Sequence, residues 1–343
     1  MKNKRDDSAI QKTRLCLDAR MYRHSGIGVY LLQLLETLKK DSSIELSVLV
    51  PESDLPEFQG ITQILFKAPI YSLKEQALYP FRIPSCDLFW SPHYNVPLLP
   101  VKAKKRRVTI HDVYHLRYAH ILGWIQRFYV WVCIYAACKW SEKIYTVSQF
   151  SKNELLAFFN VADKIEVVYN KVDIGQFSRH YPPETISKIL QHYHIDFPFV
   201  LFVGNVKPHK NLITLIKAFE KVADSVAPVR LVVVGKKEGF ITGDNEVARY
   251  LDTNPALAAK IHFTGEVLHE ELPVFYRQSR LFVFPSLYEG FGYPPLEALA
   301  AGTKVICSNA GPMPEVCGDR VIYFHPTDVS TLASLLEQNL NNL

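Results

Sequence analysis

PSLYEGFGYPPLE, residues 285–297, lies between an apolar run and a second apolar segment that ends at Gly302. The apolar run Leu281–Phe284 predicts a short buried strand. Pro294 and Pro295 suit the first positions of a helix, because a proline there loses no hydrogen bond. Gly302 suits the position just after the helix end. The segment therefore predicts a strand, then a glycine loop, then the N-terminus of a helix.

The glycine loop and the helix start predict an anion site. Gly290 and Gly292 let backbone N–H groups of the loop approach a ligand closely. The positive end of the helix dipole favours a diphosphate at the same place. We therefore place the candidate diphosphate contacts on four consecutive residues: Gly290, Phe291, Gly292 and Tyr293.

Two carboxylates bracket this loop. Glu289 precedes it, and Glu297 falls in the first turn of the predicted helix, so both can face one pocket. We expect Glu297 to hold the two hydroxyls of a ribose and Glu289 to hold hydroxyls of a sugar. The simpler alternative is that Glu297 complements the helix dipole and Glu289 is a solvated loop charge. The glycines between them favour the functional interpretation.

These residues resemble the signature of glycosyltransferase family 4. The E-x7-E element of the family corresponds to Glu289 and Glu297, inside EGFGYPPLEALAAGTKVI. Members are retaining nucleotide-sugar transferases with the α/β fold called GT-B, in which two Rossmann-like domains face each other across a cleft. The resemblance implies an acceptor-side domain at residues 1–175 and a nucleotide-sugar-binding domain at residues 176–343.

Length and composition agree with a two-domain globular protein. The chain has 343 residues, of which 48% are hydrophobic and 21% charged. A net charge of +5 suits anionic nucleotide-sugars or lipid surfaces and is too weak to indicate nucleic acid. The polar N-terminus, MKNKRDDSAIQKTR, lacks a signal-peptide core, and the cysteines form no CxxC pair. These features predict a cytoplasmic protein with reduced thiols.

The N-terminal half begins with a predicted strand at residues 15–17. Asp18-Ala19-Arg20 follows this strand, and a Gly-x-Gly segment comes next. Gly26 and Gly28, ahead of leucines at helical spacing, form half of a dinucleotide-binding pattern, with Leu31 in place of a third glycine. The alternative is that the glycines form a tight turn that lets the helix pack on the sheet. The two interpretations are compatible. The family resemblance implies that Gly26 and Gly28 contact the donor phosphates or sugar.

Further strands are predicted at residues 44–50, 64–66, 88–90 and 108–110, and their alternation with crossover connections favours a parallel sheet. The basic run 102–107 reads as a loop before the last of these strands, either simply solvated or facing a membrane surface. His111 follows that strand, at the sheet edge where ligands bind. The resemblance implies that His111 contacts the transferred sugar.

Residues 123–140, GWIQRFYVWVCIYAACKW, form the most apolar segment. Arg127 and Lys139 leave too short an apolar run to span a bilayer. We predict a core helix, and a helix lying in the inner-membrane interface stays open as the second interpretation.

The sheet of the second domain is predicted to begin with strand Phe199–Val203, which a glycine loop and a helix follow. Lys210 at that helix start would neutralise the charge of a departing diphosphate. The segment resembles the G-x5-K element of the family, with Asn205 or His209 where many members have arginine, and Lys207 or His209 is the candidate second cation. Further along the chain, the resemblance implies that Val267 and Leu268 pack on the nucleobase.

The resemblance implies a retaining hexosyltransferase of cell-surface polysaccharide biosynthesis that needs no metal or other cofactor. GDP-mannose is the first candidate donor, and the acceptor is expected to be a saccharide or a lipid-linked saccharide. We consider two other classes: a glycoside hydrolase that uses the two glutamates as an acid/base pair, and a non-catalytic nucleotide-sugar-binding protein. A hydrolase needs its carboxylates on opposite sides of the scissile bond and has no use for a diphosphate site.

Overall fold

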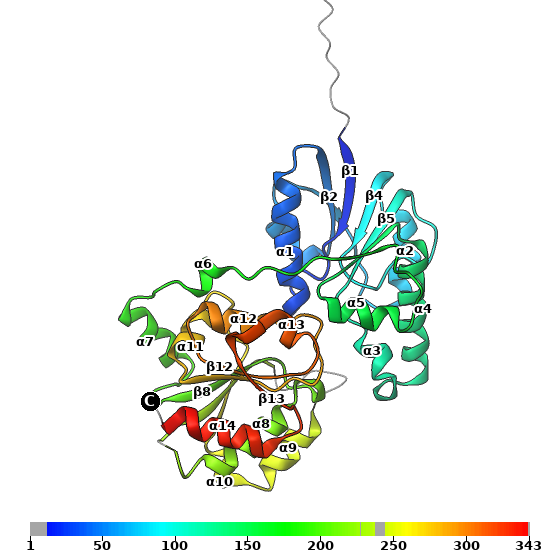
Figure 1. Cartoon of the computed structure of the whole chain (residues 1–343). Helices are drawn as coiled ribbons and strands as arrows, with labels where there is room; N and C mark the ends of the chain where they lie inside the picture. Colours follow the sequence, from blue (N-terminus) through cyan, green and yellow to red (C-terminus); the bar gives the residue numbers. More distant parts are fainter. Residues whose placement is uncertain (1–11, 227, 237–243, 342–343) are drawn as a thin grey trace, which may run out of the picture. The chain divides into compact units, whose positions relative to one another are not determined.

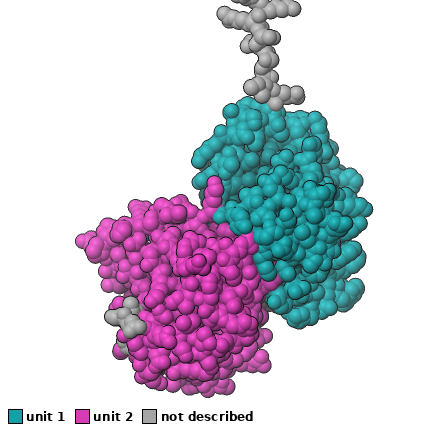
Figure 2. Space-filling view, viewed as in Figure 1, with its two compact units in different colours: residues 1–170 teal, residues 171–343 magenta. Residues whose placement is uncertain are grey.

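The computed structural model describes residues 12–226, 228–236 and 244–341. Most of the polar N-terminus considered above therefore lies outside the described residues. The chain divides into two compact units, residues 1–170 and 171–343, which Figure 2 shows in two colours. Our predicted domain boundary lay between residues 175 and 176.

Unit 1 is built on a seven-stranded sheet in which every strand pair is parallel (Figure 1). In spatial order its strands are β3 (Thr62–Leu65), β2 (Ile44–Val50), β1 (Thr13–Asp18), β4 (Cys86–Ser91), β5 (Ala103–Ile110), β6 (Lys143–Thr146) and β7 (Ile165–Val167). Its α-helices are α1 (Ser25–Lys40), α2 (Leu73–Arg82), α3 (Tyr114–Arg117), α4 (Trp124–Trp140) and α5 (Gln149–Leu156). The predicted parallel sheet is confirmed.

The basic run 102–107 was wrongly predicted to be a loop, because most of it forms the first half of β5. Neighbouring acidic groups offset its charge: Lys104 pairs with Asp87 at 2.8 Å, and Lys105 pairs with Glu142 at 2.9 Å. Successive side chains of a strand point to opposite faces of the sheet. A charged sequence can therefore form a strand when neighbouring residues supply the opposite charges.

The glycines after β1 lie inside the first turn of α1, so our prediction of a glycine loop ahead of the helix was wrong. The backbone N–H of Gly28 donates to the carbonyl of His24. A Cβ on Gly28 would lie 2.2 Å from the carbonyl oxygen of Tyr22. Gly28 is therefore required for a close backbone approach between the helix and the segment that leads into it.

Unit 2 is built on a six-stranded parallel sheet. In spatial order its strands are β10 (Ile261–Gly265), β9 (Arg230–Val234), β8 (Phe199–Val203), β11 (Leu281–Phe284), β12 (Val305–Ser308) and β13 (Ile322–Phe324). Its α-helices are α6 (Ile174–Phe177), α7 (Pro183–His192), α8 (Leu212–Val222), α9 (Asn245–Asp252), α10 (Pro255–Ala258), α11 (Leu272–Gln278), α12 (Tyr293–Ala300), α13 (Met313–Cys317) and α14 (Val329–Asn341).

The core of unit 2 lies on both faces of its sheet. Val200 and Phe202 of β8 belong to one hydrophobic cluster, whereas Leu201 and Val203 belong to another. Successive side chains of a strand point to opposite faces, so a strand buried on both sides must be apolar throughout. This explains why the run FVLFV shows no polar alternation.

Among the described residues, no helix combines the length and the apolar character that a membrane crossing requires.

The packing around Gly28 generates the first prediction. Replacing Gly28 with alanine forces the α1 backbone away from Tyr22, and overpacking of this kind costs about 1–3 kcal/mol. We expect Gly28→Ala to lower the thermal unfolding midpoint of unit 1 by several degrees in differential scanning calorimetry. The matched control is Gly123→Ala at the start of α4, where the nearest atom to a built Cβ is a flexible glutamine oxygen at 3.6 Å. Equal midpoints for the two variants would contradict this explanation.

Candidate functional site

The candidate site of unit 2 lies where the strand order of its sheet reverses. β8 pairs with β11, so the connection after β8 and the connection after β11 leave the sheet side by side at its carboxyl edge. The backbone N–H of Leu287 donates to the carbonyl of His209 at 2.8 Å and ties the two loops together. In open parallel sheets this reversal point is where ligands bind.

Lys210 and Glu289, predicted from separate motifs, meet at this point. The Lys210 ammonium donates to both carboxylate oxygens of Glu289, at 2.7 and 2.9 Å. The side chains are 19% and 13% exposed, so the pair is largely shielded yet reachable from solvent. The ammonium also lies 5.7 Å from the ring centroid of Phe284, at the end of β11. The pair forms a charged centre in which the ammonium suits an anionic ligand group and the carboxylate suits a hydrogen-bond donor.

Asn211, which the sequence analysis missed, fixes the position of Lys210. It has φ +55° and is buried directly ahead of α8. Its side-chain amide donates to the carbonyl of Pro285 at 2.9 Å and to that of Pro326 at 2.7 Å. An asparagine just before an apolar helical pattern is a helix-start signal, but the sequence could not indicate that its amide joins two distant loops.

The helix after the glycine loop begins at Tyr293, with Gly292 as its N-cap at φ +93°. A Cβ on Gly292 would lie 2.2 Å from the terminal methyl of Met313, so no other residue fits there without rearrangement. Because Pro294 and Pro295 carry no N–H, the first turn of this helix has fewer backbone donors than an ordinary helix start. The predicted strand, glycine loop and helix are confirmed.

Glu297 is the fifth residue of this helix, just past the first turn in which it was predicted, and it is only 5% exposed. The hydroxyl of Tyr276, on α11, donates to Glu297 Oε2 at 2.7 Å. Burial raises the pKa of Glu297 to about 7, and the Tyr276 hydrogen bond lowers it only in part. Tyr276 was also missed, because a tyrosine in an apolar helix pattern gives no signal beyond core packing.

The two carboxylates have separate partners in the described part of the chain. Glu289 pairs with Lys210, and Glu297 accepts from Tyr276. That both face one ligand pocket therefore stays a prediction, as do the ribose and sugar roles assigned to them.

The other predicted residues of unit 2 border the same sheet edge. The side-chain oxygen of Asn205, after β8, accepts the backbone N–H of Lys236 at 3.1 Å, so Asn205 links the segments that follow β8 and β9. After β10, Val267 packs half-buried on the core whereas Leu268 is 58% exposed. Leu268 thus has free apolar surface for a nucleobase, and that role stays a prediction.

In unit 1, His111 directly follows β5, as predicted. Its Nε2 lies 2.9 Å from the carbonyl oxygen of Pro92, which accepts the Nε2 proton. Its ring packs edge-on against Tyr30 at 4.8 Å, and burial lowers the pKa of His111 below its usual value. His111 is therefore a neutral, fixed ring. Its contact with a sugar, and those of the exposed Gly26 and buried Gly28, stay predictions.

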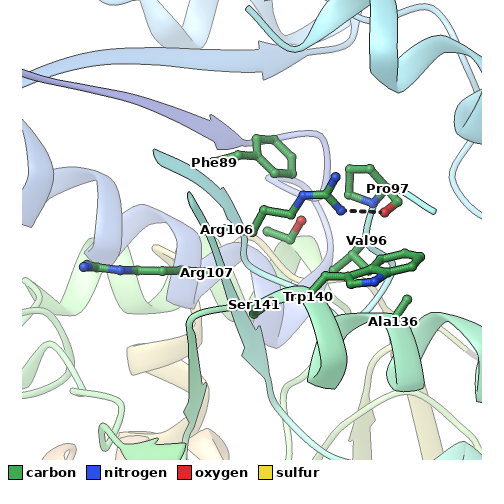
Figure 3. A pocket seen from close by; sticks show the side chains of 9 residues that line it. Phe89, Val96, Pro97, Arg106, Arg107, Ala136, Trp140 and Ser141 are labelled. Carbon is green, nitrogen blue, oxygen red and sulfur yellow. Dashed lines mark hydrogen bonds between the residues drawn. The ribbon is translucent and has the colours of Figure 1, made fainter. Parts of the chain in front are cut away.

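A shallow pocket in unit 1 is lined by none of these residues (Figure 3). Arg106 lines it, donates to the carbonyl of Pro97 at 3.1 Å and lies over the ring of Trp140. The guanidinium therefore binds groups of the protein itself, and the pocket adds nothing to the candidate site.

No group of three or more histidine, cysteine, aspartate or glutamate side chains is placed to hold a metal ion among the residues that the structure describes.

The buried carboxylate of Glu297 generates a pH prediction. The folded state keeps its proton up to about pH 7, whereas the unfolded chain releases it near 4.5. Folded protein therefore binds the extra proton between these values, and its stability falls as the pH rises through that window. The difference is on the order of 3 kcal/mol. We expect Glu297→Gln to raise the unfolding midpoint of unit 2 relative to wild type at pH 8, and by much less at pH 5.

The control for this prediction is Glu266→Gln, whose wild-type carboxylate is 66% exposed beside Lys236. It should shift the midpoint by the same small amount at both pH values. A Glu297→Gln difference that does not change with pH would contradict the prediction.

The O-antigen chain mannosyltransferase B of Escherichia coli is 31% identical over 204 residues, covering 59% of this chain and 52% of that protein. RfbU, an O-antigen chain mannosyltransferase of Salmonella typhimurium, is 28% identical over 251 residues, covering 73% and 64%. The matches thus span about half to two thirds of these relatives. HepE of Anabaena in complex with UDP-glucose superposes with a TM-score of 0.74 at 17% identity, covering 96% of this chain and 90% of HepE.

The structural likeness confirms the predicted GT-B fold class. Two family models match consecutive parts of the chain and leave little of it uncovered. The model for glycosyltransferase family 4 matches residues 24–176, and the model for glycosyl transferases group 1 matches residues 186–342. The chain belongs to glycosyltransferase family 4.

Proposed function

We propose that this protein is a retaining glycosyltransferase of cell-surface polysaccharide biosynthesis. It moves a hexosyl group from a nucleoside-diphosphate sugar to a saccharide or lipid-linked saccharide. The observation that carries the proposal is the shielded pair of Lys210 and Glu289 at the point where the β8 and β11 loops meet. One member suits a phosphate and the other suits sugar hydroxyls, so a single centre serves both halves of a nucleotide-sugar.

The chemistry assigned to Lys210 is stabilisation of the leaving diphosphate. An ammonium has three N–H donors, and Glu289 accepts two in this structure, so Lys210 can bind phosphate without losing its hold on the carboxylate. The attraction between Lys210 and the phosphate grows as the bond to the sugar breaks, which is how such a charge lowers a barrier. Glu289, held by Lys210, accepts hydrogen bonds from sugar hydroxyls.

The nucleoside is assigned to Glu297 and Leu268. A buried glutamate that one tyrosine holds can accept two ribose hydroxyls, and the exposed Leu268 side chain offers apolar surface to a base. In unit 1, the neutral ring of His111 is assigned to the transferred sugar. The reaction is proposed to need no metal, because Lys210 and the N-terminal end of α12 supply the positive charge that a diphosphate requires.

Mannose is the first candidate sugar, and GDP-mannose the first candidate donor. The support is that the two relatives described above are named as mannosyltransferases of the O-antigen chain. HepE, by contrast, was crystallised with UDP-glucose, so a screen must include UDP-sugars. The matched control for a donor screen by thermal shift is the free nucleoside diphosphate of each base, which separates recognition of the nucleoside from recognition of the sugar.

The decisive test of the proposed function is release of nucleoside diphosphate from candidate donors, measured with and without a saccharide acceptor. A transferase releases it faster when acceptor is present. A glycoside hydrolase leaves the nucleotide-sugar intact and cleaves the saccharide, and a non-catalytic protein binds the donor without turnover. Either of the last two results would overturn the proposal.

The Lys210 assignment predicts a large and selective loss of rate. We expect Lys210→Ala to lower kcat by about 100- to 1,000-fold, the range for removing one group that stabilises transition-state charge. The matched control is Lys217→Ala on α8, whose ammonium pairs with Glu246 at 2.9 Å on the surface, and it should retain full activity. Unchanged donor binding and turnover in Lys210→Ala would refute the diphosphate role.

We further propose that the protein works at the cytoplasmic face of the inner membrane and contacts it through α4. One face of α4 packs in the core of unit 1, which confirms the predicted core helix. The opposite face carries Trp124, Phe128 and Trp131, which are 78%, 66% and 47% exposed and recur at helical spacing. Arg127 and Lys139 are exposed on the same helix. Aromatic residues beside cations suit the interface of an anionic bilayer.

The membrane proposal predicts a loss of vesicle binding. We expect the combined change of Trp124, Phe128 and Trp131 to serine to lower co-sedimentation with phosphatidylglycerol vesicles by at least about tenfold. The control changes Leu73 and Phe81 of α2, which are 84% and 80% exposed, to serine. Equal loss in both variants, or a change in oligomeric state with unchanged vesicle binding, would overturn the proposal.

A further inference from the structure

Tyr276 is a buried tyrosine whose hydroxyl contacts the carboxylate assigned to the ribose. It lies on α11, is fully buried, and donates to Glu297 Oε2 at 2.7 Å. Burial, followed by the nearby Glu297, raises the pKa of Tyr276 well above its usual value, so the hydroxyl keeps its proton. The hydrogen bond therefore has one direction, from the tyrosine to the glutamate.

The Tyr276 side chain has no freedom to turn away from Glu297. Its ring packs edge-on against the rings of Phe177 and Phe282, whose centroids are 5.8 and 5.2 Å away. Its backbone carbonyl accepts the hydroxyl of Thr303 at 2.6 Å, from the segment that follows α12. The helix that bears Glu297 is therefore tied to Tyr276 through the glutamate itself and through the segment after its end. Packing and hydrogen bonds of this kind hold a site residue in one rotamer.

The two carboxylate oxygens of Glu297 have different surroundings. Oε2 accepts from Tyr276, whereas Oε1 receives no hydrogen bond from any residue that the structure describes. Oε1 is nevertheless not fully buried, so a ligand hydroxyl can reach it. A hydroxyl that donates to a carboxylate needs an oxygen of this kind, with free lone pairs and an open approach. Tyr276 thus occupies one oxygen of the carboxylate and leaves the other to a ligand.

Tyr276 is also the group that favours the ionised form of Glu297. Burial raises the pKa of Glu297 to about 7, and the hydrogen bond from Tyr276 lowers it in part. Besides α11, α12 packs against α6, β11 and β12, which carry no charged side chain. The thiol of Cys307 on β12 interacts with a second cysteine. On α11, the guanidinium of Arg277 donates to the carbonyl of Ser178. Among the described residues, the tyrosine hydroxyl is therefore the neighbour that stabilises the carboxylate.

We propose that Tyr276 is a positioning residue for the donor, which holds Oε2 of Glu297 so that Oε1 faces the ribose hydroxyls. The inference rests on the proposed function, in which Glu297 binds the ribose, and it adds that Tyr276 sets the strength and the pH dependence of that contact. An ionised carboxylate accepts a hydrogen bond more strongly than a neutral carboxyl group. Ribose binding therefore favours loss of the Glu297 proton, and nucleotide affinity rises as the pH rises through about 7.

The test measures binding of GDP and 2′-deoxy-GDP by isothermal titration calorimetry from about pH 5.5 to about pH 8.5. Wild type should bind GDP at least about tenfold more tightly than 2′-deoxy-GDP at the upper pH, because the deoxy compound lacks a hydroxyl that donates to Glu297. Tyr276→Phe should lower this ratio to about threefold or less, since the carboxylate can then turn away from the ribose. The variant should also move the pH of half-maximal GDP affinity upward by about 1, because the phenylalanine no longer favours the carboxylate.

Two controls separate positioning from a structural role. Tyr250→Phe removes a matched hydroxyl, which donates to Glu220 Oε2 at 2.6 Å on the surface, and it should change neither readout. Glu297→Gln has no carboxylate to titrate, so its pH curve records the titration of the GDP phosphates, and adding Tyr276→Phe should not move that curve. If Tyr276 only supports the fold, Tyr276→Phe weakens both nucleotides equally and leaves the pH curve in place. That result would overturn the inference.

Donor turnover separates the inference from the proposed function. If wild type turns over a donor but Tyr276→Phe changes neither the deoxy ratio nor the pH curve, the inference is wrong and the proposed function stands. If wild type binds GDP as described but releases no nucleoside diphosphate from any donor, the proposed function is wrong and the inference stands. If GDP does not bind, UDP and 2′-deoxy-UDP take its place, and absence of binding by both bases would contradict the inference.

Discussion

The reversal of strand order between β8 and β11 is the constraint on which the candidate site depends. It brings two loops from distant parts of the sequence to one edge of the sheet. The side chain of Asn211 then joins the two loops by donating to the carbonyl of Pro285. The ion pair of Lys210 and Glu289 is a second link between them. A parallel sheet buried on both faces holds these loops rigidly, because apolar packing on each side leaves its strands no freedom to shift.

The sequence predicted much of this arrangement for identifiable reasons. Uninterrupted apolar runs marked β8 and β11, and glycines, prolines and a terminal Gly302 marked the segment that became α12. Lys210 was singled out by its place between a strand and a helix, and Glu289 by its place beside the glycine loop. Their contact was not predicted, since it follows from which strands pair, and a sequence pattern records the strands without their spatial order.

The errors have equally specific causes. The basic run before Val108 was predicted to be a loop because it is highly charged. The sequence did not indicate that Asp87 and Glu142 pair with its lysines and allow it to join β5. Gly28 was predicted to precede a helix that in fact includes it. The glycine is needed there because the Tyr22 carbonyl approaches it closely, and the sequence pattern does not show that contact. Tyr276 gave no signal, since its hydroxyl matters only once Glu297 is buried beside it. In each case, contacts between residues distant in the sequence determined the local structure, and the local sequence pattern does not record such contacts.

The central claim is that unit 2 holds a nucleoside diphosphate at the meeting point of the β8 and β11 loops. A crystal structure of the protein soaked with GDP tests it most directly. The account predicts a phosphate oxygen within about 3.2 Å of the Lys210 ammonium and ribose hydroxyls on the Glu297 carboxylate. A nucleotide bound elsewhere, or bound here without contact to either side chain, would contradict the account.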